Sequence, residues 1–309
     1  MRLATFRSPE GPRTAAVMGA ELADLTAVGG PGDLLSLLRD GQPTERLTSL
    51  LRRAPRTPLD EAKLLAPLPR PGKFLAIGMN ARDHRRDVNL RWLAREPGNI
   101  RIALGYLLAH PRPRHPFFFA KATSCVTGPY DPIWTPGAAR RVDWEGELAV
   151  VIGTRARRLD SAAAARDAIA GYMITNDVSV RDWQTDNPTG PLLAKGYDTH
   201  GPLGPWLVTA DELDPADLRL RTLLNGRQRQ HGRIADLIHS PAEIVAILSN
   251  FCTLEPGDVI ACGTFAGTGW PAGRFLRPGD TVRVEIDGLG HIENPVIAEP
   301  HATSTAATS

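Results

Sequence analysis

The sequence has little that would place this protein outside a reducing compartment. Its 309 residues include only three cysteines, Cys125, Cys252 and Cys262, and none stands in a Cys-x-x-Cys spacing. An odd cysteine count argues against a disulfide framework, and free cysteines are typical of intracellular proteins. The N-terminus lacks the apolar stretch of a signal peptide, and no run approaches the ~18 apolar residues of a membrane span. We therefore expect a cytoplasmic protein without a membrane segment.

The sequence also lacks an excess of either charge. It has 36 basic and 34 acidic residues, for a net charge of +2. Proteins that bind nucleic acid or anionic membranes usually carry a marked positive excess, so neither partner is expected. At 42% hydrophobic residues, the chain is long enough to bury one large core and a smaller one.

Turn residues and hydrophobic patterning divide the chain into three parts. We predict a small N-terminal α+β domain over 1–66, a catalytic domain over 67–300 and a disordered tail over 301–309. From Phe117 onward, short apolar segments bounded by Gly, Pro, Asn or Asp predict many strands. The strands do not alternate regularly with helices, which excludes a doubly wound fold. The fold class is therefore mainly β (α+β), with a few covering helices.

Local patterns predict a few further elements. The first 25 residues resemble two strands around a Pro/Gly turn, and residues 34–51 have helical character. A helix over 161–170 would end at Gly171. Ser240 and Glu243 form a capping box that opens another helix. Residues 97–116 are rich in proline and show no clear period, so we expect a long loop there.

Acidic residues occur among apolar ones at two places. Glu145 and Glu147 lie two apart at the start of a strand pattern, so they share a face. Asp177 lies in a second apolar pattern. Neighbouring buried carboxylates repel one another unless a cation compensates them, and oxygen donors select Mg²⁺, Mn²⁺ or Ca²⁺ and not zinc. The spacing alone leaves an equal alternative: a solvent-facing glutamate pair, with Asp177 capping a turn.

Several motifs occur in a fixed order between Lys73 and Val296. They are AIGMNARDH, PFFFAKATSCVTGP, VDWEGELAVVIG, GYMITNDVSVRDWQ, LLAKGYDTHGPLGPWLVT, LLNGRQRQ and LEPGDVIACGT followed by AGTG. In this order the chain resembles the fumarylacetoacetate hydrolase family, in its acylpyruvate hydrolase and 2-oxo-dienoate isomerase-decarboxylase branch. The resemblance implies a mixed β-roll catalytic domain, a homodimer, and Glu145, Glu147 and Asp177 as ligands of Mg²⁺ or Mn²⁺.

His84 and Asp87 stand three residues apart, which brings them to one face if the segment is helical. A carboxylate beside an imidazole suits a general base. Taken alone, an exposed histidine among arginines is the better interpretation. The resemblance reverses it, because similar enzymes carry a His–acid pair on a lid over the substrate. The usual acid is Glu, and here it is Asp87.

The resemblance also implies roles for further residues. Lys195 would stabilise negative charge that develops on the substrate. Gln184 would contact substrate or water, Thr264 with Gly263 would bind a substrate carboxylate, and Lys121 would lie near the site. Arg181 is as well explained by pairing with one of the acids as by contact with substrate.

The chain departs from the family pattern in three places. Asn80-Ala81 replaces the usual Asn-Tyr, Phe265 follows Gly263-Thr264 where proline is usual, and the segment between His84 and Pro116 is long. These differences suggest a larger and more apolar pocket, as a bulky acyl substrate would need.

The predicted reaction is hydrolysis of a C–C bond in a 1,3-dicarbonyl or acylpyruvate-type oxo acid through a metal-stabilised enolate. Decarboxylation, tautomerisation or isomerisation of a 2-oxo acid would use the same site, so these alternatives stay open. A different class of function is also open: a family member that binds metal without catalysis.

Overall fold

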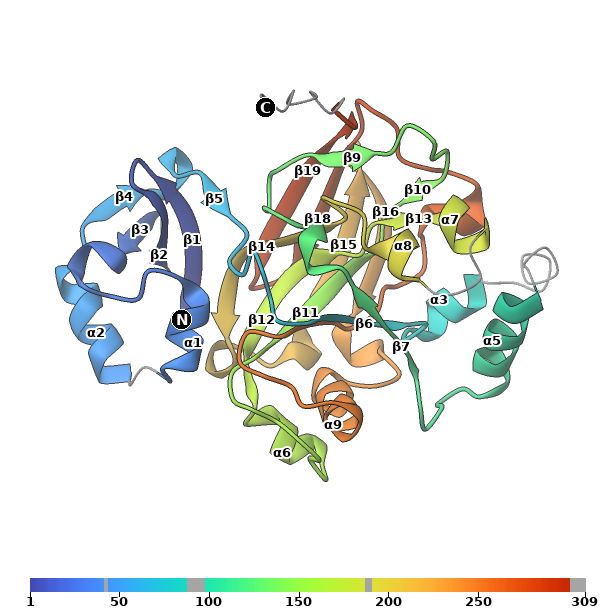
Figure 1. The fold of residues 1–309 in the computed structure, drawn as a ribbon, viewed down its shortest axis with the longest axis horizontal. Coiled ribbons are helices and arrows are strands. Elements are labelled where there is room, and N and C mark those ends of the chain that lie inside the picture. The colour runs from blue at the N-terminus through green and yellow to red at the C-terminus, as the bar shows by residue number, and fades with distance from the viewer. Residues whose placement is uncertain (42–43, 88–97, 187–190, 301–309) are drawn as a thin grey trace, which may run out of the picture.

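The computed structural model describes residues 1–41, 44–87, 98–186 and 191–300. The N-terminal part is a strand-rich unit at the left of Figure 1. Its elements are β1 (Arg2–Ser8), β2 (Gly11–Met18), β3 (Glu21–Asp24), α1 (Leu34–Arg39), α2 (Thr44–Arg53), β4 (Arg56–Pro58) and β5 (Leu64–Leu65), with 3-10 turns at Thr26–Val28 and Leu59–Glu61. The chain thus forms three strands where the sequence predicted two, and two helices where it predicted one.

The remaining strands form most of the second part of the chain. They are β6 (Phe74–Gly78), β7 (Phe117–Lys121), β8 (Val126–Thr127), β9 (Ile133–Thr135), β10 (Val142–Asp143), β11 (Gly146–Ile152), β12 (Ile169–Asn176), β13 (Ser179–Val180), β14 (Gly201–Thr209), β15 (Arg219–Leu224), β16 (Arg227–Arg233), β17 (Val259–Ala261), β18 (Thr281–Ile286) and β19 (Gly290–Ala298). This strand-rich α+β architecture confirms the predicted fold class.

Two sheets carry the fold. The larger runs in the order β4-β3-β2-β1-β14-β12-β11-β17-β6-β7, and the smaller in the order β16-β15-β18-β19-β9. The N-terminal unit joins the larger sheet where Arg2 and Leu3 of β1 pair with Val208 and Leu207 of β14. The division at residue 66 therefore stays a prediction, since the strands on both sides of it belong to one sheet.

Strand β11 lies at the centre and is buried on both faces. Leu148, Val150 and Ile152 contact the core shared with the smaller sheet, whereas Ala149 and Val151 contact the core that faces α1 and α2. Alternate residues of a strand point to opposite faces, so an uninterrupted apolar run suits a strand covered on both sides. The acidic residues stand at the N-terminal end of this strand.

The described helices of the second part lie around the sheets, with α5 at the right-hand edge of Figure 1. They are α3 (Arg82–Asp87), α5 (Gly98–Ala109), α6 (Ala162–Arg166), α7 (Arg181–Asp186), α8 (Leu192–Lys195), α9 (Pro241–Phe251) and α10 (Gly269–Ala272), with 3-10 turns at Thr123–Cys125, Ala210–Glu212, Pro215–Asp217 and Ile234–Asp236. The predicted capping box of α9 is confirmed, because both reciprocal bonds between Ser240 and Glu243 form.

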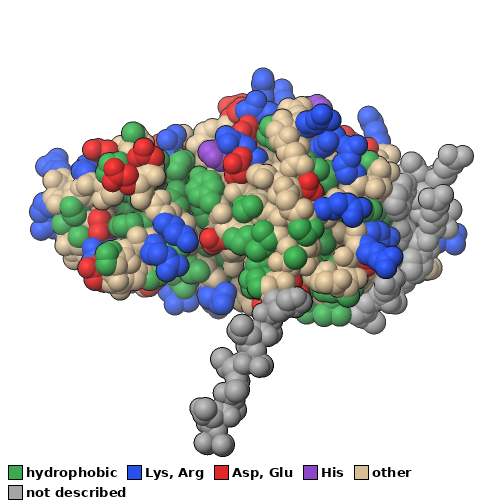
Figure 2. All heavy atoms as spheres, turned by 90° about the horizontal axis from the view of Figure 1, so that it is seen from above, with side chains coloured by type: hydrophobic (Ala, Val, Ile, Leu, Met, Phe, Trp, Pro, Cys, Tyr) green, Lys and Arg blue, Asp and Glu red, His purple; other side chains and the backbone are tan. Residues whose placement is uncertain are grey.

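Within the described ranges, no helix is both long and apolar enough to cross a membrane. Basic and acidic side chains are interspersed on the face drawn in Figure 2, which agrees with the small net charge.

Two local predictions were wrong. Residues 97–116 are not one long loop, because they contain helix α5; its Leu, Ala and Ile residues favour a helix, and the prolines lie outside it. Helix α6 ends at Arg166, and Gly171 lies inside β12. A Cβ at Gly171 would stand 2.1 Å from the carbonyl oxygen of Val208, so this glycine serves close strand packing and not a helix end. The predicted disordered tail lies outside the described residues.

Asn80 fixes the chain between β6 and α3, just before His84. Its amide nitrogen donates to the carbonyl oxygens of His239 (2.9 Å) and Cys262 (2.8 Å), and its amide oxygen accepts from the backbone N–H of His239 at 2.9 Å. The side chain is 1% exposed. Because water cannot replace these bonds, the position of α3 depends on this residue.

Replacing Asn80 with alanine is expected to lower the free energy of unfolding by about 2–4 kcal/mol, because buried backbone groups lose their partners. Asn250→Ala is the matched control. Asn250 is exposed and donates to the carbonyl oxygens of Leu159 and Ala246, so the expected loss is within about 0.5 kcal/mol. Urea denaturation of both variants measures the difference, and equal losses would contradict the anchoring role of Asn80.

Candidate functional site

Three carboxyl groups meet where β11 begins and β12 ends. Glu145 precedes β11, Glu147 is its second residue, and Asp177 directly follows β12. The two strands are antiparallel, and the backbone N–H of Asp177 donates to the carbonyl oxygen of Glu145 at 2.8 Å. One carboxylate oxygen from each acid lies within 4.8 Å of the other two. The side chains of the predicted ligand set are therefore together, and they are 6%, 2% and 1% exposed.

Gly146, between the two glutamates, allows the smaller sheet to approach. A Cβ at this position would stand 2.2 Å from Oγ1 of Thr222 on β15 and 3.0 Å from Val284 on β18. Both glutamates point away from that contact, because their side chains lie on the opposite face of the strand. The Glu-Gly-Glu sequence thus combines close sheet packing on one face with two carboxylates on the other.

Two buried lysines compensate part of the negative charge. Nζ of Lys195 lies 2.6 Å from Oε2 of Glu145 and 2.7 Å from Oδ2 of Asp177. Nζ of Lys121 lies 2.5 Å from Oδ1 of Asp177 and also donates to the carbonyl oxygen of His200 at 3.1 Å. Both lysine side chains are at most 5% exposed. Buried charges of this kind persist only when paired.

Arg181 pairs with the acids, as one of its two predicted roles required. Its guanidinium forms an ion pair with Glu145 and another with Asp143, where the Nη2–Oδ2 distance is 2.8 Å. It lies 5.2 Å from the ring centroid of Trp270. Oε1 of Gln184 accepts a hydrogen bond from Nη1 of Arg181 at 3.0 Å, which leaves the amide nitrogen of Gln184 to contact a ligand.

Glu147 differs from its neighbours because its charge is the least compensated. Its Oε2 accepts from the backbone N–H of Gly263 at 2.6 Å. Burial, followed by the charges of Asp177 and Glu145, raises the pKa of Glu147 well above its usual value. Burial acts on Glu145 in the same direction, but Lys195 and Arg181 outweigh it and lower the pKa of Glu145. With all three acids ionised, two lysines face three carboxylates, and Arg181 is shared with Asp143.

This donor set fits a hard divalent cation. Carboxylate oxygens are the preferred ligands of Mg²⁺ and Mn²⁺, and Glu145, Glu147 and Asp177 would supply them. A cation would also remove the repulsion that raises the pKa of Glu147. The ammonium group of Lys195, held between Glu145 and Asp177, already demonstrates that positive charge is stabilised at this place.

His84 lies in α3 and is 6% exposed. Among the described residues, no group forms a hydrogen bond with its Nδ1. Burial lowers the pKa of His84, while the charge of Glu145 acts in the opposite direction. The imidazole is therefore neutral at pH 7 and has an unprotonated nitrogen that can act as a base.

Among the described residues no hydrogen bond joins Asp87 to Nδ1 of His84, and the predicted pairing of the two residues stays a prediction. Oδ2 of Asp87 instead accepts from the backbone N–H of Gly267 at 2.8 Å. Asp83 contacts the same loop, because its Oδ2 accepts from the backbone N–H of Ala266 at 3.2 Å. Both acids of α3 thus hold the helix against residues 266–267, where a backbone amide donates to one oxygen of each carboxylate.

Thr264 is buried beside the acids, but its hydroxyl is engaged with protein. Oγ1 donates to the carbonyl oxygen of Gly146 at 3.0 Å and accepts from Nε2 of Gln230 at 2.8 Å. The hydroxyl proton is thus not available to a substrate carboxylate. Contact between the substrate and the backbone of Gly263 or Thr264 stays a prediction.

Sequence reasoning missed Asp143, which organises one side of the site. Oδ1 of Asp143 accepts from the backbone N–H of Gly269 (2.6 Å), and Oδ2 accepts from Nε of Arg181 (2.9 Å) and from the N–H of Trp270 (3.0 Å). Asp143 is fully buried. The sequence held a signal for this role: Asp143 lies two residues before Glu145, and residues two apart in an extended chain share a face.

The fold and this site define a class of β-rich protein with a buried carboxylate centre for a divalent cation. A family model for the fumarylacetoacetate hydrolase C-terminal domain matches residues 73–297. The chain belongs to the fumarylacetoacetate hydrolase family, as its ordered motifs predicted.

Three relatives illustrate the range of activities found around this chain. A mitochondrial oxaloacetate tautomerase from Bos taurus is 37% identical over an alignment of 314 positions. The alignment covers 96% of this chain and 92% of the relative. Maleylpyruvate hydrolase from Sphingobium sp. SYK-6, solved with manganese(II) and pyruvate, is 31% identical with a TM-score of 0.77, covering 97% of this chain and 100% of that one. A 2-hydroxyhepta-2,4-diene-1,7-dioate isomerase from Mycobacterium marinum is 34% identical with a TM-score of 0.73, covering 97% and 99%. Hydrolase, isomerase and tautomerase thus all occur among similar proteins.

We predict that Glu147→Gln weakens Mn²⁺ binding by more than about 100-fold, since loss of a residue that merely orients a ligand costs about 10–100-fold. Titration calorimetry with Mn²⁺ and Mg²⁺ measures the affinity, and a thermal shift on metal addition gives a second readout. The control is Glu255→Gln, because Glu255 pairs with Arg155 at the surface. Unchanged Mn²⁺ affinity in Glu147→Gln would contradict the ligand assignment.

Proposed function

We propose that this chain hydrolyses a C–C bond in an acylpyruvate-type oxo acid, using a divalent cation held by Glu145, Glu147 and Asp177. The observation that carries the proposal is the combination of this buried carboxylate cluster with the ammonium group of Lys195 and a neutral, buried His84. A general base beside a cationic centre is what water attack on a carbonyl requires. The manganese and pyruvate bound to the similar maleylpyruvate hydrolase support the cation and the kind of product.

A cation held by Glu145, Glu147 and Asp177 would supply Lewis-acid polarisation of the oxo-acid oxygens. His84 accepts a proton from water as the water oxygen forms a bond to the distal carbonyl carbon. The adjacent C–C bond breaks, and its electron pair leaves with the pyruvate-like fragment as an enolate. The imidazolium of His84 returns the proton to the enolate carbon. The products are a carboxylic acid and a 2-oxo acid.

Lys195 would stabilise the negative charge that develops during this reaction. Its pKa is raised, because Asp177 and Glu145 outweigh the opposing effect of burial, so it stays protonated at neutral pH. Its Nζ also lies 5.3 Å from the ring centroid of Phe119, which borders the site with an aromatic surface. Arg181 and Asp143 would act as positioning residues for Glu145.

Tautomerisation of oxaloacetate is the second candidate, and the similarity to the bovine tautomerase over nearly the whole chain favours it. It needs proton transfer at the carbon between the carbonyls and no attacking water. The same cation site and base would serve, so product analysis must separate the two reactions.

The assay uses purified chain with Mg²⁺ or Mn²⁺ and a panel of acylpyruvates, oxaloacetate and 2-oxo-dienoates. We expect loss of the acylpyruvate enol absorbance together with stoichiometric release of pyruvate and a carboxylic acid. Oxaloacetate interconversion without C–C cleavage would assign a tautomerase, and oxaloacetate loss with CO₂ a decarboxylase. No turnover with either metal would favour the non-catalytic alternative.

We predict that His84→Gln lowers kcat by about 10²–10⁴-fold, the usual contribution of a general base, while Mn²⁺ affinity is retained. His115→Gln is the control, because His115 is exposed and contacts Phe251 away from the acids. A His84→Gln variant with wild-type kcat would sink this role for His84.

The pH dependence of kcat/KM provides a separate prediction. Burial lowers the pKa of His84 below 6.5, so the base stays neutral and active at pH 7. Activity is expected to fall only when the pH drops through this lowered value, because the imidazole then becomes protonated. A wild-type acid limb with a midpoint above 6.5 would contradict the prediction.

The family resemblance also implies a homodimer, which stays a proposal until light scattering gives the mass of the purified chain.

A further inference from the structure

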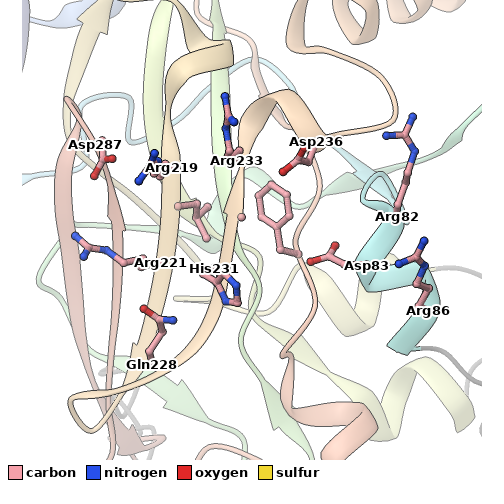
Figure 3. Close-up of a pocket in the computed structure, with 13 residues that line it drawn as sticks. Arg82, Asp83, Arg86, Arg219, Arg221, Gln228, His231, Arg233, Asp236 and Asp287 are labelled. Atoms are coloured by element: carbon pink, nitrogen blue, oxygen red, sulfur yellow. The ribbon is translucent and has the colours of Figure 1, made fainter.

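A hollow lies on the outer face of the β15–β16 hairpin, and α3 forms its other wall (Figure 3). Its volume is about 730 Å³, which lies within the range of small-molecule sites. Five arginines from three elements line it: Arg82 and Arg86 of α3, Arg219 and Arg221 of β15, and Arg233 of β16. None of these residues takes part in the carboxylate site.

The hairpin places like charges directly opposite one another. Arg219 pairs with Arg233 in the antiparallel register, and both side chains are exposed on one face. Directly opposite Cβ atoms in such a ladder lie about 4.5–5.5 Å apart, and like charges there destabilise the sheet. Arg221 reaches Glu285 at 3.0 Å. Among the ion pairs of the described residues, none includes Arg219 or Arg233.

Helix α3 repeats the pattern on the opposite wall. Arg82 and Arg86 are four residues apart, so they share a face of the helix, and both are exposed. The ion pairs formed within the described ranges include neither of them. Figure 3 shows the two arginines on α3 at one side of the hollow, across from the hairpin arginines.

Acidic side chains offset only part of this charge. Asp83, Asp236 and Asp287 also line the hollow, and Glu285 pairs with Arg221, so five arginines face four carboxylates. Asp83 is occupied by backbone amides, since it accepts from the N–H groups of His84 (2.7 Å) and Ala266 (3.2 Å). The buried Phe265, where the family pattern has proline, contributes an aromatic surface.

We propose that this hollow binds a small multivalent anion that carries phosphate or carboxylate groups. Guanidinium groups bind such oxyanions through paired N–H donors. An anion between the hairpin and α3 would relieve two like-charge pairs at once: Arg219 with Arg233, and Arg82 with Arg86. This gain is absent for a neutral ligand or a cation, so the repulsion itself specifies the charge of the ligand.

The anion would also act on the reaction, a step that rests on the proposed function. Helix α3 carries His84, and Asp83 and Asp87 tie the helix to residues 266–267. An anion that joins α3 to the hairpin stabilises the docked helix and thus the position of His84. A ligand shifts a conformational equilibrium by its differential affinity for the two states, so the anion is expected to lower KM for the oxo acid.

The binding test uses the whole chain with Mg²⁺ and adds inorganic phosphate or succinate, with ionic strength held constant by KCl. We expect a saturable rise in Tm and measurable heat of binding with at least one of the two anions. A response to phosphate identifies phosphate chemistry, and a response to succinate identifies carboxylate chemistry. If neither anion gives more than KCl alone, the proposal is overturned.

Variants separate the hollow from the carboxylate site. In the double variant Arg219→Gln/Arg233→Gln the dissociation constant is expected to rise at least 10-fold. Its Tm in KCl alone should not fall, because a repulsive pair is removed. Arg227→Gln is the control, since Arg227 is exposed on the same strand but outside the hollow. Binding that survives unchanged in the double variant would overturn the site; the single variant Arg233→Gln serves if the double variant does not fold.

The kinetic test compares KM with and without the bound anion. We expect at least a twofold decrease in wild type and no change in the double variant. If the anion binds but KM stays unchanged, the proposed coupling through α3 is overturned. If the chain proves inactive on every oxo acid, the proposed function fails, whereas the calorimetric result still decides the binding site.

Discussion

The burial of Glu145, Glu147 and Asp177, where β11 begins and β12 ends, is the constraint on which the surrounding structure depends. Three carboxylates removed from water repel one another and lose solvation, and each effect favours the protonated form. Nearby groups counter this tendency unequally. Lys195 contacts Glu145 and Asp177, whereas Glu147 has the amide of Gly263. The residual imbalance falls on Glu147, and a divalent cation would correct it without a further side chain. The same imbalance links stability to function, because without a cation the repulsion favours the protonated form of Glu147.

The arrangement of the two sheets follows from the same region. The run from Leu148 to Ile152 in β11 is apolar on both faces, and the two glutamates lie just before it, at the N-terminal end of the strand. Gly146 brings the smaller sheet against one face while the glutamates use the other. Asp143 and Arg181 then extend the network toward α10 through the backbone of Gly269 and Trp270. Asn80 carries no charge and holds the backbone of Cys262, next to Gly263, so we expect a substitution there to affect the site through backbone position and not through charge.

Sequence reasoning could predict what depends on local spacing and on ordered motifs. The shared face of Glu145 and Glu147 follows from strand periodicity, and the capping box of α9 follows from Ser240 and Glu243. It could not predict competition among partners. Spacing places Asp87 near His84, but it does not show that Oδ2 of Asp87 accepts from the N–H of Gly267, a residue far away in the sequence. The helix over Gly98–Ala109 was missed because flanking prolines obscured it. Gly171 was misjudged because the close contact with β14 arises only between distant segments.

Helix α3 lies between the buried acids and the arginines of the hairpin, so its position can link binding at the proposed anion site to the position of His84. One of its faces carries His84 toward the acids, and another carries Arg82 and Arg86 toward the arginines of the hairpin. On the acid side a cation would be stabilising, and on the arginine side the proposed anion would be. Each ion would remove repulsion from one side of a six-residue helix that Asp83, Asp87 and the buried Arg85 hold through hydrogen bonds to backbone groups. Because both ions would favour the same docked helix, binding at one site should strengthen binding at the other, and the coupling must be reciprocal.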